Sequence, residues 1–173
     1  PIDIEFVDFK IETILSIVKK EDLLMNGLIN GKATISNLET KPSFISDIKV
    51  DDFVFNGEEV GDISIKVDNQ TADLLNAEVL LSGGENNLDI AGTYRISNGG
   101  LDLNADINHL NIKSIQGFTM NNVTEGTGFL TGNFKVAGTV DAPNVNGELK
   151  FNGAGFRITK LNSYFKMSDD KIQ

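Results

Sequence analysis

The sequence predicts an all-β protein whose mainly antiparallel strands are joined by short turns. Most of its apolar residues are Ile, Leu, Val and Phe, which fit the half-buried surface of a sheet. Its 17 glycines, with abundant Asn and Asp, supply the tight turns that many short strands require. Several segments also alternate between apolar and polar residues with a period of two, which indicates strands with one dry and one wet face.

Two segments depart from this alternation. In Ile11–Lys20 and in Ile112–Met120, apolar residues at mixed spacing follow a strand-like run. Each pattern predicts a short helix or an irregular crossover between strands. Both segments are too short to cover a large sheet.

The alternating segments define one apolar face. In Leu101–Asn108 the odd positions are apolar and the even ones are Asp or Asn, and three other segments behave in the same way. A curled sheet would line its groove with the apolar positions Ile63, Ile65, Val67, Leu88, Ile90, Tyr94, Ile96, Leu101, Leu103, Ile107, Leu130, Phe134, Val136, Leu149 and Phe151.

Turn signals separate the strands at short intervals. They are Asn56-Gly57, Ser82-Gly83-Gly84, Ser97-Asn98-Gly99-Gly100 and Asn152-Gly153. Connections this short predict a meander, in which consecutive strands are neighbours in the sheet. Gly126-Thr127-Gly128 precedes a strand and lacks a following Gly-Lys, so it indicates a bulge or a close backbone approach rather than a phosphate loop.

An apolar face of this extent has to be covered. Alternation is equally compatible with a closed β-sandwich and with an open, curled groove that meets a partner or holds an apolar ligand. The periodicity does not separate these two architectures.

An internal repeat relates the two ends of the chain. Shifting the sequence by 101 residues places Ile11 on Ile112 and Pro42 on Pro143, and glycines and apolar positions stay in phase. We therefore expect 1–173 to be a single β-rich segment of a longer protein, with related modules at about 1–100 and 101–173.

Charge and motif content exclude several functions. A net charge of −10 repels nucleic acid and anionic lipid headgroups, so contact with lipid should go through acyl chains. There is no cysteine, and the motifs of hydrolases, nucleotide-binding loops and zinc proteases are missing from the sequence. The single histidine, His109, is expected to be structural. We expect no catalysis, cofactor or metal.

One long motif resembles a known family. From Gly126 to Phe151 the chain reads GTGFLTGNFKVAGTVDAPNVNGELKF. This resembles the recurrent glycine and proline pattern of TamB and AsmA-like proteins, and the Asn- and Lys-rich composition resembles that of Bacteroidetes homologues. The structural positions of the motif are Gly128, Gly132, Gly138, Pro143 and Gly147. The first module departs from it at Asn37 and Ser46.

The resemblance implies a sheet curled into a U-shaped, apolar-lined groove, a β-taco. It also implies an internal fragment of a periplasmic protein anchored in the inner membrane of a Gram-negative bacterium. Such a protein would carry phospholipid towards the outer membrane and support outer-membrane biogenesis, with a BamA/TamA-like outer-membrane partner. The alternative is a scaffold that pairs with a β-strand of a client during outer-membrane protein assembly or secretion.

Overall fold

The computed structural model describes residues 1–17, 24–37, 43–168 and 171–172. Strands make up most of these described residues, which also include two short α-helices and two 3-10 turns. In chain order the elements are β1 (Ile2–Lys10), α1 (Ile11–Ile17), β2 (Met25–Ser36), β3 (Ser43–Phe55), β4 (Glu58–Thr71), β5 (Leu74–Gly83), β6 (Asn86–Arg95), β7 (Gly100–Asn111), α2 (Ile112–Gln116), η1 (Gly117–Thr119), β8 (Val123–Thr139), β9 (Ala142–Ile158), η2 (Thr159–Leu161), β10 (Ser163–Ser168) and β11 (Lys171–Ile172).

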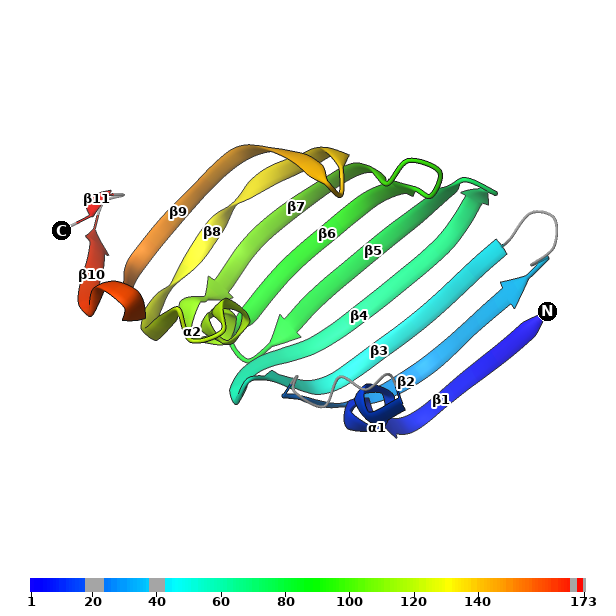
Figure 1. Ribbon diagram of the computed structural model, residues 1–173, viewed down its shortest axis with the longest axis horizontal. Helices are drawn as coiled ribbons and strands as arrows, with labels where there is room; N and C mark the ends of the chain where they lie inside the picture. Colours follow the sequence, from blue (N-terminus) through cyan, green and yellow to red (C-terminus); the bar gives the residue numbers. More distant parts are fainter. Residues whose placement is uncertain (18–23, 38–42, 169–170, 173) are drawn as a thin grey trace.

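The strands form one antiparallel sheet in which spatial order follows chain order from β1 to β11 (Figure 1). The predicted all-β class and the predicted meander are therefore confirmed. Short helices also occur where they were expected, after β1 and after β7. Residues 18–20 of the first expected helix lie outside the described residues.

Two of the predicted turns need correction. Asn152-Gly153 is not a turn: it lies inside β9, where Gly153 has φ +58° and the pairing with β8 changes register. An Asn-Gly pair adopts positive φ in a bulge as readily as in a hairpin, so the sequence signal was ambiguous. Ser82 and Gly83 still belong to β5, and that turn is made by Gly84 and Glu85.

The register places apolar residues of neighbouring strands opposite one another. Since opposite residues point to the same side of a sheet, one face is apolar and the other is polar. On the polar face, charged residues of adjacent strands form exposed ion pairs. These join Glu5 to Lys32 at 3.2 Å, Asp47 to Lys66 at 3.8 Å and Asp102 to Lys135 at 2.8 Å.

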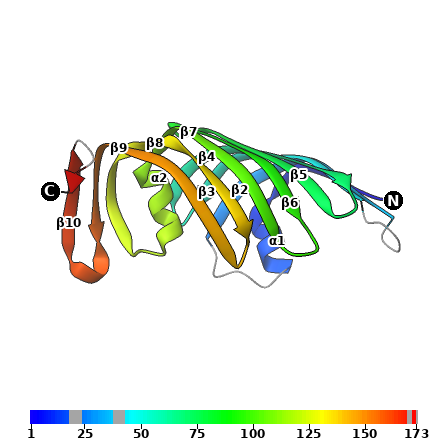
Figure 2. The same ribbon diagram turned by 90° about the horizontal axis from the view of Figure 1, so that it is seen from above.

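Both helices lie on the apolar face (Figure 2). Ile11 of α1 and Ile112 of α2 are buried in one cluster with side chains from β2 to β9. The core thus sits between the helices and one end of the strands, and no helix of the described segments lies on the other end. Among the described residues, no helix is long and apolar enough to cross a membrane.

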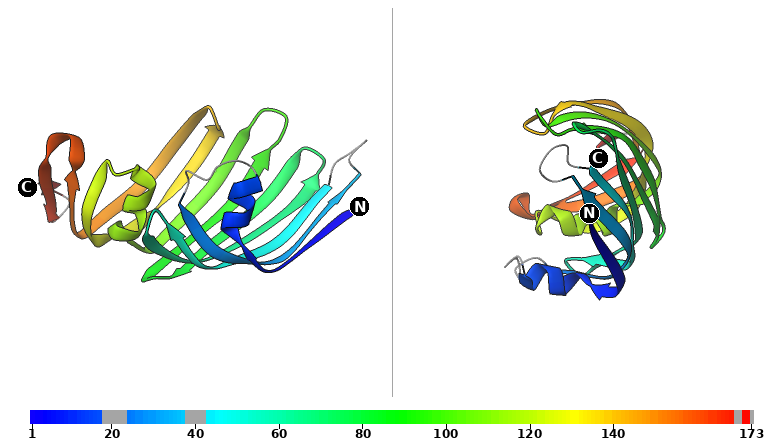
Figure 3. Two further views of the ribbon diagram at one scale, coloured as in Figure 1. Left: turned by 60° about the horizontal axis from the view of Figure 1, so that its bottom comes forward. Right: turned by 90° about the vertical axis from the view of Figure 1, so that its right-hand side faces the viewer.

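The strands bend towards the helices (Figure 3). Their pairing shifts register near the ends of the strands that the helices cover, between Phe6 and Phe9 in β1 and between Ile107 and Leu110 in β7. The extra residues adopt positive φ at Asp8 (47°), Asp52 (52°) and Glu125 (56°). Bulges increase the local bend and twist of a strand, so a row of them turns one end of the sheet over the helices.

The described strands belong to a single layer, and β1 and β9 are not paired with each other. The closed sandwich allowed by the sequence is therefore wrong for the described part of the chain. In that part of the chain, helices cover the apolar face at one end only.

The two ends of the chain share an order of elements. At the shift of 101 residues, β1, α1, β2 and β3 fall on β7, α2, β8 and β9. The bulge between Phe6 and Phe9 falls on the one between Ile107 and Leu110, and β2 and β8 also share a bulge position. A gene duplication remains a prediction, but it is compatible with this correspondence.

Candidate functional site

The apolar face is built from rows of side chains that cross the strands. Ile65 of β4 lies opposite Ile48 on one side and Val79 on the other, and Ile90 lies opposite Val79 and Ala105. A second row runs from Val67 to Val145 by way of Leu103 and Val136. Apart from Ile96, the expected residues therefore share one continuous surface.

Part of this surface is covered. Six of the expected residues belong to the cluster that packs under the helices, and two of these six, Ile107 (6% exposed) and Leu130 (8% exposed), are buried. The six are Ile63, Leu88, Ile107, Leu130, Phe134 and Phe151. They act as core.

The other part, which we call the open apolar face, lies outside that cluster. Its residues are half-buried, apart from Leu149, which is 45% exposed. They are Ile65, Val67, Ile90, Tyr94, Leu101, Leu103, Val136 and Leu149. No charged side chain belongs to this set.

Ile96 does not belong to the face. It lies in the turn after β6 and is 48% exposed, and its backbone N–H donates to the Asp73 carbonyl oxygen at 2.9 Å. The alternation of β6 stops at Arg95 because the chain turns there to begin the next hairpin. Sequence alternation alone did not reveal where that strand ends.

Sequence reasoning missed several residues of the same face. Val79 lies in the run Val79-Leu80-Leu81, where an outward-facing, 47% exposed Leu80 hides the alternation. Val145, 59% exposed, stands among asparagines. Ile2 and Ile4 of β1 lie opposite inward-facing residues of β2 and are 50% and 38% exposed.

The glycines of the family-like motif permit close approach between strands. A Cβ on Gly132 would lie 2.0 Å from the Glu148 carbonyl oxygen, and one on Gly147 would lie 2.2 Å from that of Asn133. Gly128 marks the predicted bulge, with φ +72° and a register shift beside it. Gly138 and Pro143 lie opposite each other near the β8–β9 turn.

A buried asparagine, also missed in the sequence, fixes α2 to the sheet. Asn86 at the start of β6 is 4% exposed. Its side-chain amide donates to the Val60 carbonyl oxygen at 2.7 Å and to Ser114 Oγ at 2.9 Å. Its Oδ1 accepts a hydrogen bond of 2.8 Å from the Asn111 backbone N–H. Both N–H groups of the Asn86 side-chain amide donate, and its oxygen accepts one hydrogen bond.

A second contact attaches the end of α2 to the β3–β4 hairpin. The Phe118 ring stacks on Phe55 with centroids 4.4 Å apart, and Asn56 Nδ2 donates to the Gly117 carbonyl oxygen at 2.7 Å. Because the chain returns from α2 to β8, these contacts tie β3 and β4 to β7 and β8 across the apolar face. They fix the end of α2 over the covered end of the sheet.

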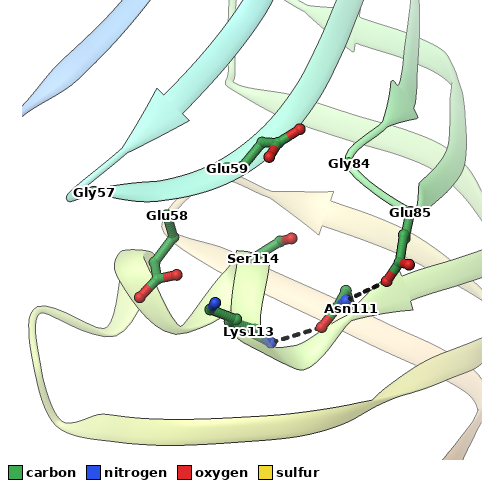
Figure 4. A pocket seen from close by; sticks show the side chains of 8 residues that line it. All are labelled: Gly57, Glu58, Glu59, Gly84, Glu85, Asn111, Lys113 and Ser114. Carbon is green, nitrogen blue, oxygen red and sulfur yellow. Dashed lines mark hydrogen bonds between the residues drawn. The ribbon is translucent and has the colours of Figure 1, made fainter.

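A polar pocket of about 510 Å³ lies beside α2 (Figure 4). Glu58, Glu59 and Glu85 line it together with Lys113, and Asn111 Nδ2 donates to Glu85 at 3.3 Å. Within the described part of the chain, no three His, Cys, Asp or Glu side chains are grouped so that they could hold a metal ion. The pocket is a polar seam between two hairpin turns and the helix.

No protein-family model, curated protein or solved structure matches this chain. The resemblance to TamB and AsmA-like proteins therefore rests on the sequence motif from Gly126 to Phe151. The function has to be inferred from the surface of the molecule.

The remaining polar side chains indicate structural roles. His109 stacks on Phe129 with ring centroids 3.9 Å apart, at the bulge of β7. Hydrogen bonds from Lys49 and then Asn30 hold the pKa of Asp51 below its ordinary value on the polar face. The Arg157 guanidinium, 2.7 Å from the carboxylate of Glu125, lowers the pKa of Glu125 in the same way. These groups tie neighbouring strands together.

Proposed function

We propose that the open apolar face carries phospholipid acyl chains. The supporting observation is a continuous apolar surface that crosses the sheet from β2 to β9 and that the helices cover at one end only. A soluble protein rarely leaves a surface of this extent uncovered unless it meets an apolar partner or ligand. The bent strands would form the walls of a shallow groove.

The dimensions suit an extended alkyl chain. Neighbouring strands lie ~4.8 Å apart, so the seven steps from β2 to β9 span about 34 Å. Each CH₂ group removed from water contributes about 0.8 kcal/mol. A chain lying along the rows would therefore be held without a dedicated headgroup site.

The charge of the protein fits this mode of binding. The open apolar face carries no charged group, and the net charge of −10 disfavours docking of the polar face on an anionic bilayer. Binding would then depend on apolar contact, and its affinity should change little with salt.

The sequence motif suggests the biological setting. If the chain is a TamB- or AsmA-like segment, its parent is a periplasmic protein anchored in the inner membrane. Lipid would then pass along successive modules towards a BamA/TamA-like partner in the outer membrane. No catalytic step is needed, because transfer requires only an apolar path.

The proposal is tested by replacing one residue on each face of β7. Leu103 points to the open apolar face and lies opposite Gly92 and Val136, whereas Asn104 is exposed on the polar face. Native mass spectrometry, with lipid extraction, on gently purified protein should show bound phospholipid in the wild type and in Asn104→Glu. Leu103→Glu should lose it, because a carboxylate on the face would have to be desolvated by an acyl chain.

Thermal melts of the variants separate binding from folding. A folded Leu103→Glu protein that retains lipid would contradict the proposal. So would a lipid-free wild type that remains unable to bind added phospholipid.

A second candidate function, a scaffold for client strands, is favoured by the outer edge of β1. That edge pairs with no described strand, and the exposed Val7 (72%) lies on it. An added outer-membrane β-strand peptide should then protect the β1 amides from hydrogen exchange. Phospholipid alone should not.

A further inference from the structure

A small apolar pocket of about 150 Å³ lies between α2 and the strands β8 and β9. Ile112 and Ile115 of α2 form one wall, and the others contain Val123 and Leu130 of β8 and Phe156 of β9. Among the described residues that line this pocket, none carries a charge. It therefore differs in character from the polar pocket on the other side of α2.

The polar side chains in its wall are engaged by the chain itself. Gln116 Oε1 accepts a hydrogen bond of 2.8 Å from the Gly126 backbone N–H, and the Gln116 amide nitrogen donates to Glu58. Thr119 Oγ1 donates to the Gln116 carbonyl oxygen at 2.6 Å and accepts from the Val123 backbone N–H at 3.0 Å. A polar group buried here would give up its hydrogen bonds to water, whereas a hydrocarbon group would lose none.

The pocket adjoins the open apolar face. Leu149 of that face lies opposite Gly132, which follows the pocket residue Leu130 by two positions in β8. Two residues of a strand span only about 7 Å, and Gly132 places no side chain between the two leucines. A hydrocarbon chain that lies on Leu149 therefore reaches the pocket without leaving apolar surface.

We propose that this pocket holds the terminal methyl end of an acyl chain whose remaining carbons lie on the open apolar face. This inference rests on the proposed function. Apolar protein cavities of ~150 Å³ bind molecules of the size of benzene, so about six carbons fill such a space and a whole acyl chain does not. The methyl end fits because it is the part of the lipid without a polar group.

The pocket gives the bound lipid one orientation. With the methyl end beside α2, the ester and the headgroup lie towards the part of the face that no described helix covers. There the polar end of the lipid remains in contact with water.

Fluorine NMR tests where the methyl end lies. Delipidated protein is loaded with less than one equivalent of phosphatidylcholine that carries one fluorine, either on the terminal carbon or in the middle of an acyl chain. A soluble gadolinium chelate should enhance the relaxation of the mid-chain fluorine more than that of the terminal fluorine, because the open apolar face is half-exposed and the pocket encloses the chain end. Equal enhancement at the two positions, or stronger enhancement at the terminal one, would overturn the proposal.

A pocket-filling variant tests whether this pocket provides the shelter. Val123→Phe places an aromatic ring in the pocket, so the terminal fluorine should become accessible to the chelate. Phospholipid binding should weaken on the order of ten-fold, because several CH₂ groups lose their burial. Val140→Phe adds the same ring at an exposed position in the β8–β9 turn and should behave like the wild type.

Thermal melts show whether the variants are folded, and the two fluorine positions in the wild type decide the question even if Val123→Phe does not fold. A terminal fluorine that stays protected in folded Val123→Phe would overturn the proposal. A wild type that binds no phospholipid would overturn the proposed function and this inference together. Bound phospholipid with an accessible terminal fluorine would overturn this inference alone.

Discussion

A single buried polar side chain, Asn86, helps to attach α2 to the sheet. Asn86 reaches from β6 to β4 and α2, three elements that are far apart in the sequence. A buried amide with all its partners rigidifies a site, and one with missing partners is costly. The position of α2 on the apolar face therefore depends on this side chain.

Asn86→Ala should lower the free energy of unfolding by about 1–3 kcal/mol, because the Val60 carbonyl, Ser114 and the Asn111 N–H lose their partner. Asn87→Ala is the matched control, since Asn87 is exposed and accepts one hydrogen bond from Asn108 at 2.9 Å. Denaturant titration measures the free energy of unfolding of both variants. Equal losses would show that Asn86 does not anchor α2.

Glycines allow strands to approach where a side chain would not fit. A Cβ at Gly132 would lie 2.0 Å from a backbone oxygen, whereas one at Gly153 would meet nothing within 4 Å. Gly132→Ala should therefore cost about 3 kcal/mol of stability. Gly153→Ala should cost only about 1 kcal/mol, from its positive φ. Similar costs in thermal melts would contradict this account of the strand contact.

At this scale, alternation predicted which side chains share a face, because opposite residues in a sheet point to the same side. It assigned Leu101, Leu103 and Ile107 correctly to one face. It could not predict the end of β6 at Arg95, the bulge at Gly153 or the anchor at Asn86. These depend on contacts between residues distant in the sequence.

At the scale of elements, turns are tied to each other as well as to their strands. Asp73, in the β4–β5 turn, accepts hydrogen bonds from the Ser97 backbone N–H at 2.8 Å, from Ser97 Oγ at 3.0 Å and from Arg95 at 3.1 Å. The β4–β5 and β6–β7 hairpins are thus joined at one end of the sheet.

This contact predicts a response to acid. The Ser97 backbone hydrogen bond, followed by the Ser97 hydroxyl and Arg95, holds the pKa of Asp73 below its usual value. A lowered folded-state pKa contributes stability above the unfolded pKa of about 3.9, and this is lost as pH falls through the folded pKa. The Ser97 amide resonance should shift only in that acidic range, and Asp73→Asn should abolish the shift. If the Ser97 amide resonance of Asp73→Asn still shifted in the same acidic range, Asp73 would not be the group responsible.

The two short helices were predicted from broken periodicity, and both are present. Their docking on one side of the sheet was not predictable from their own sequences. Both helices lie over the strand ends that the bulges bend, and α2 is also held by the Phe118–Phe55 stack, which joins residues of different modules.

For the whole molecule, the main feature is the division of the apolar face into a covered and an uncovered part. The sequence left a sandwich and an open sheet equally possible, because both require the same alternation. The register and the placement of the helices distinguish them. The central proposal is that phospholipid acyl chains occupy the uncovered part.

The most direct measurement uses quenching by phospholipid with brominated acyl chains. The chain has no cysteine, so a fluorophore can be attached at Leu103→Cys on the open apolar face or at Asn104→Cys on the polar face. If acyl chains lie on the open apolar face, the brominated lipid should quench the label at 103 strongly and the label at 104 weakly. Equal quenching at both positions, or none at 103 under conditions in which lipid binds, would contradict the account.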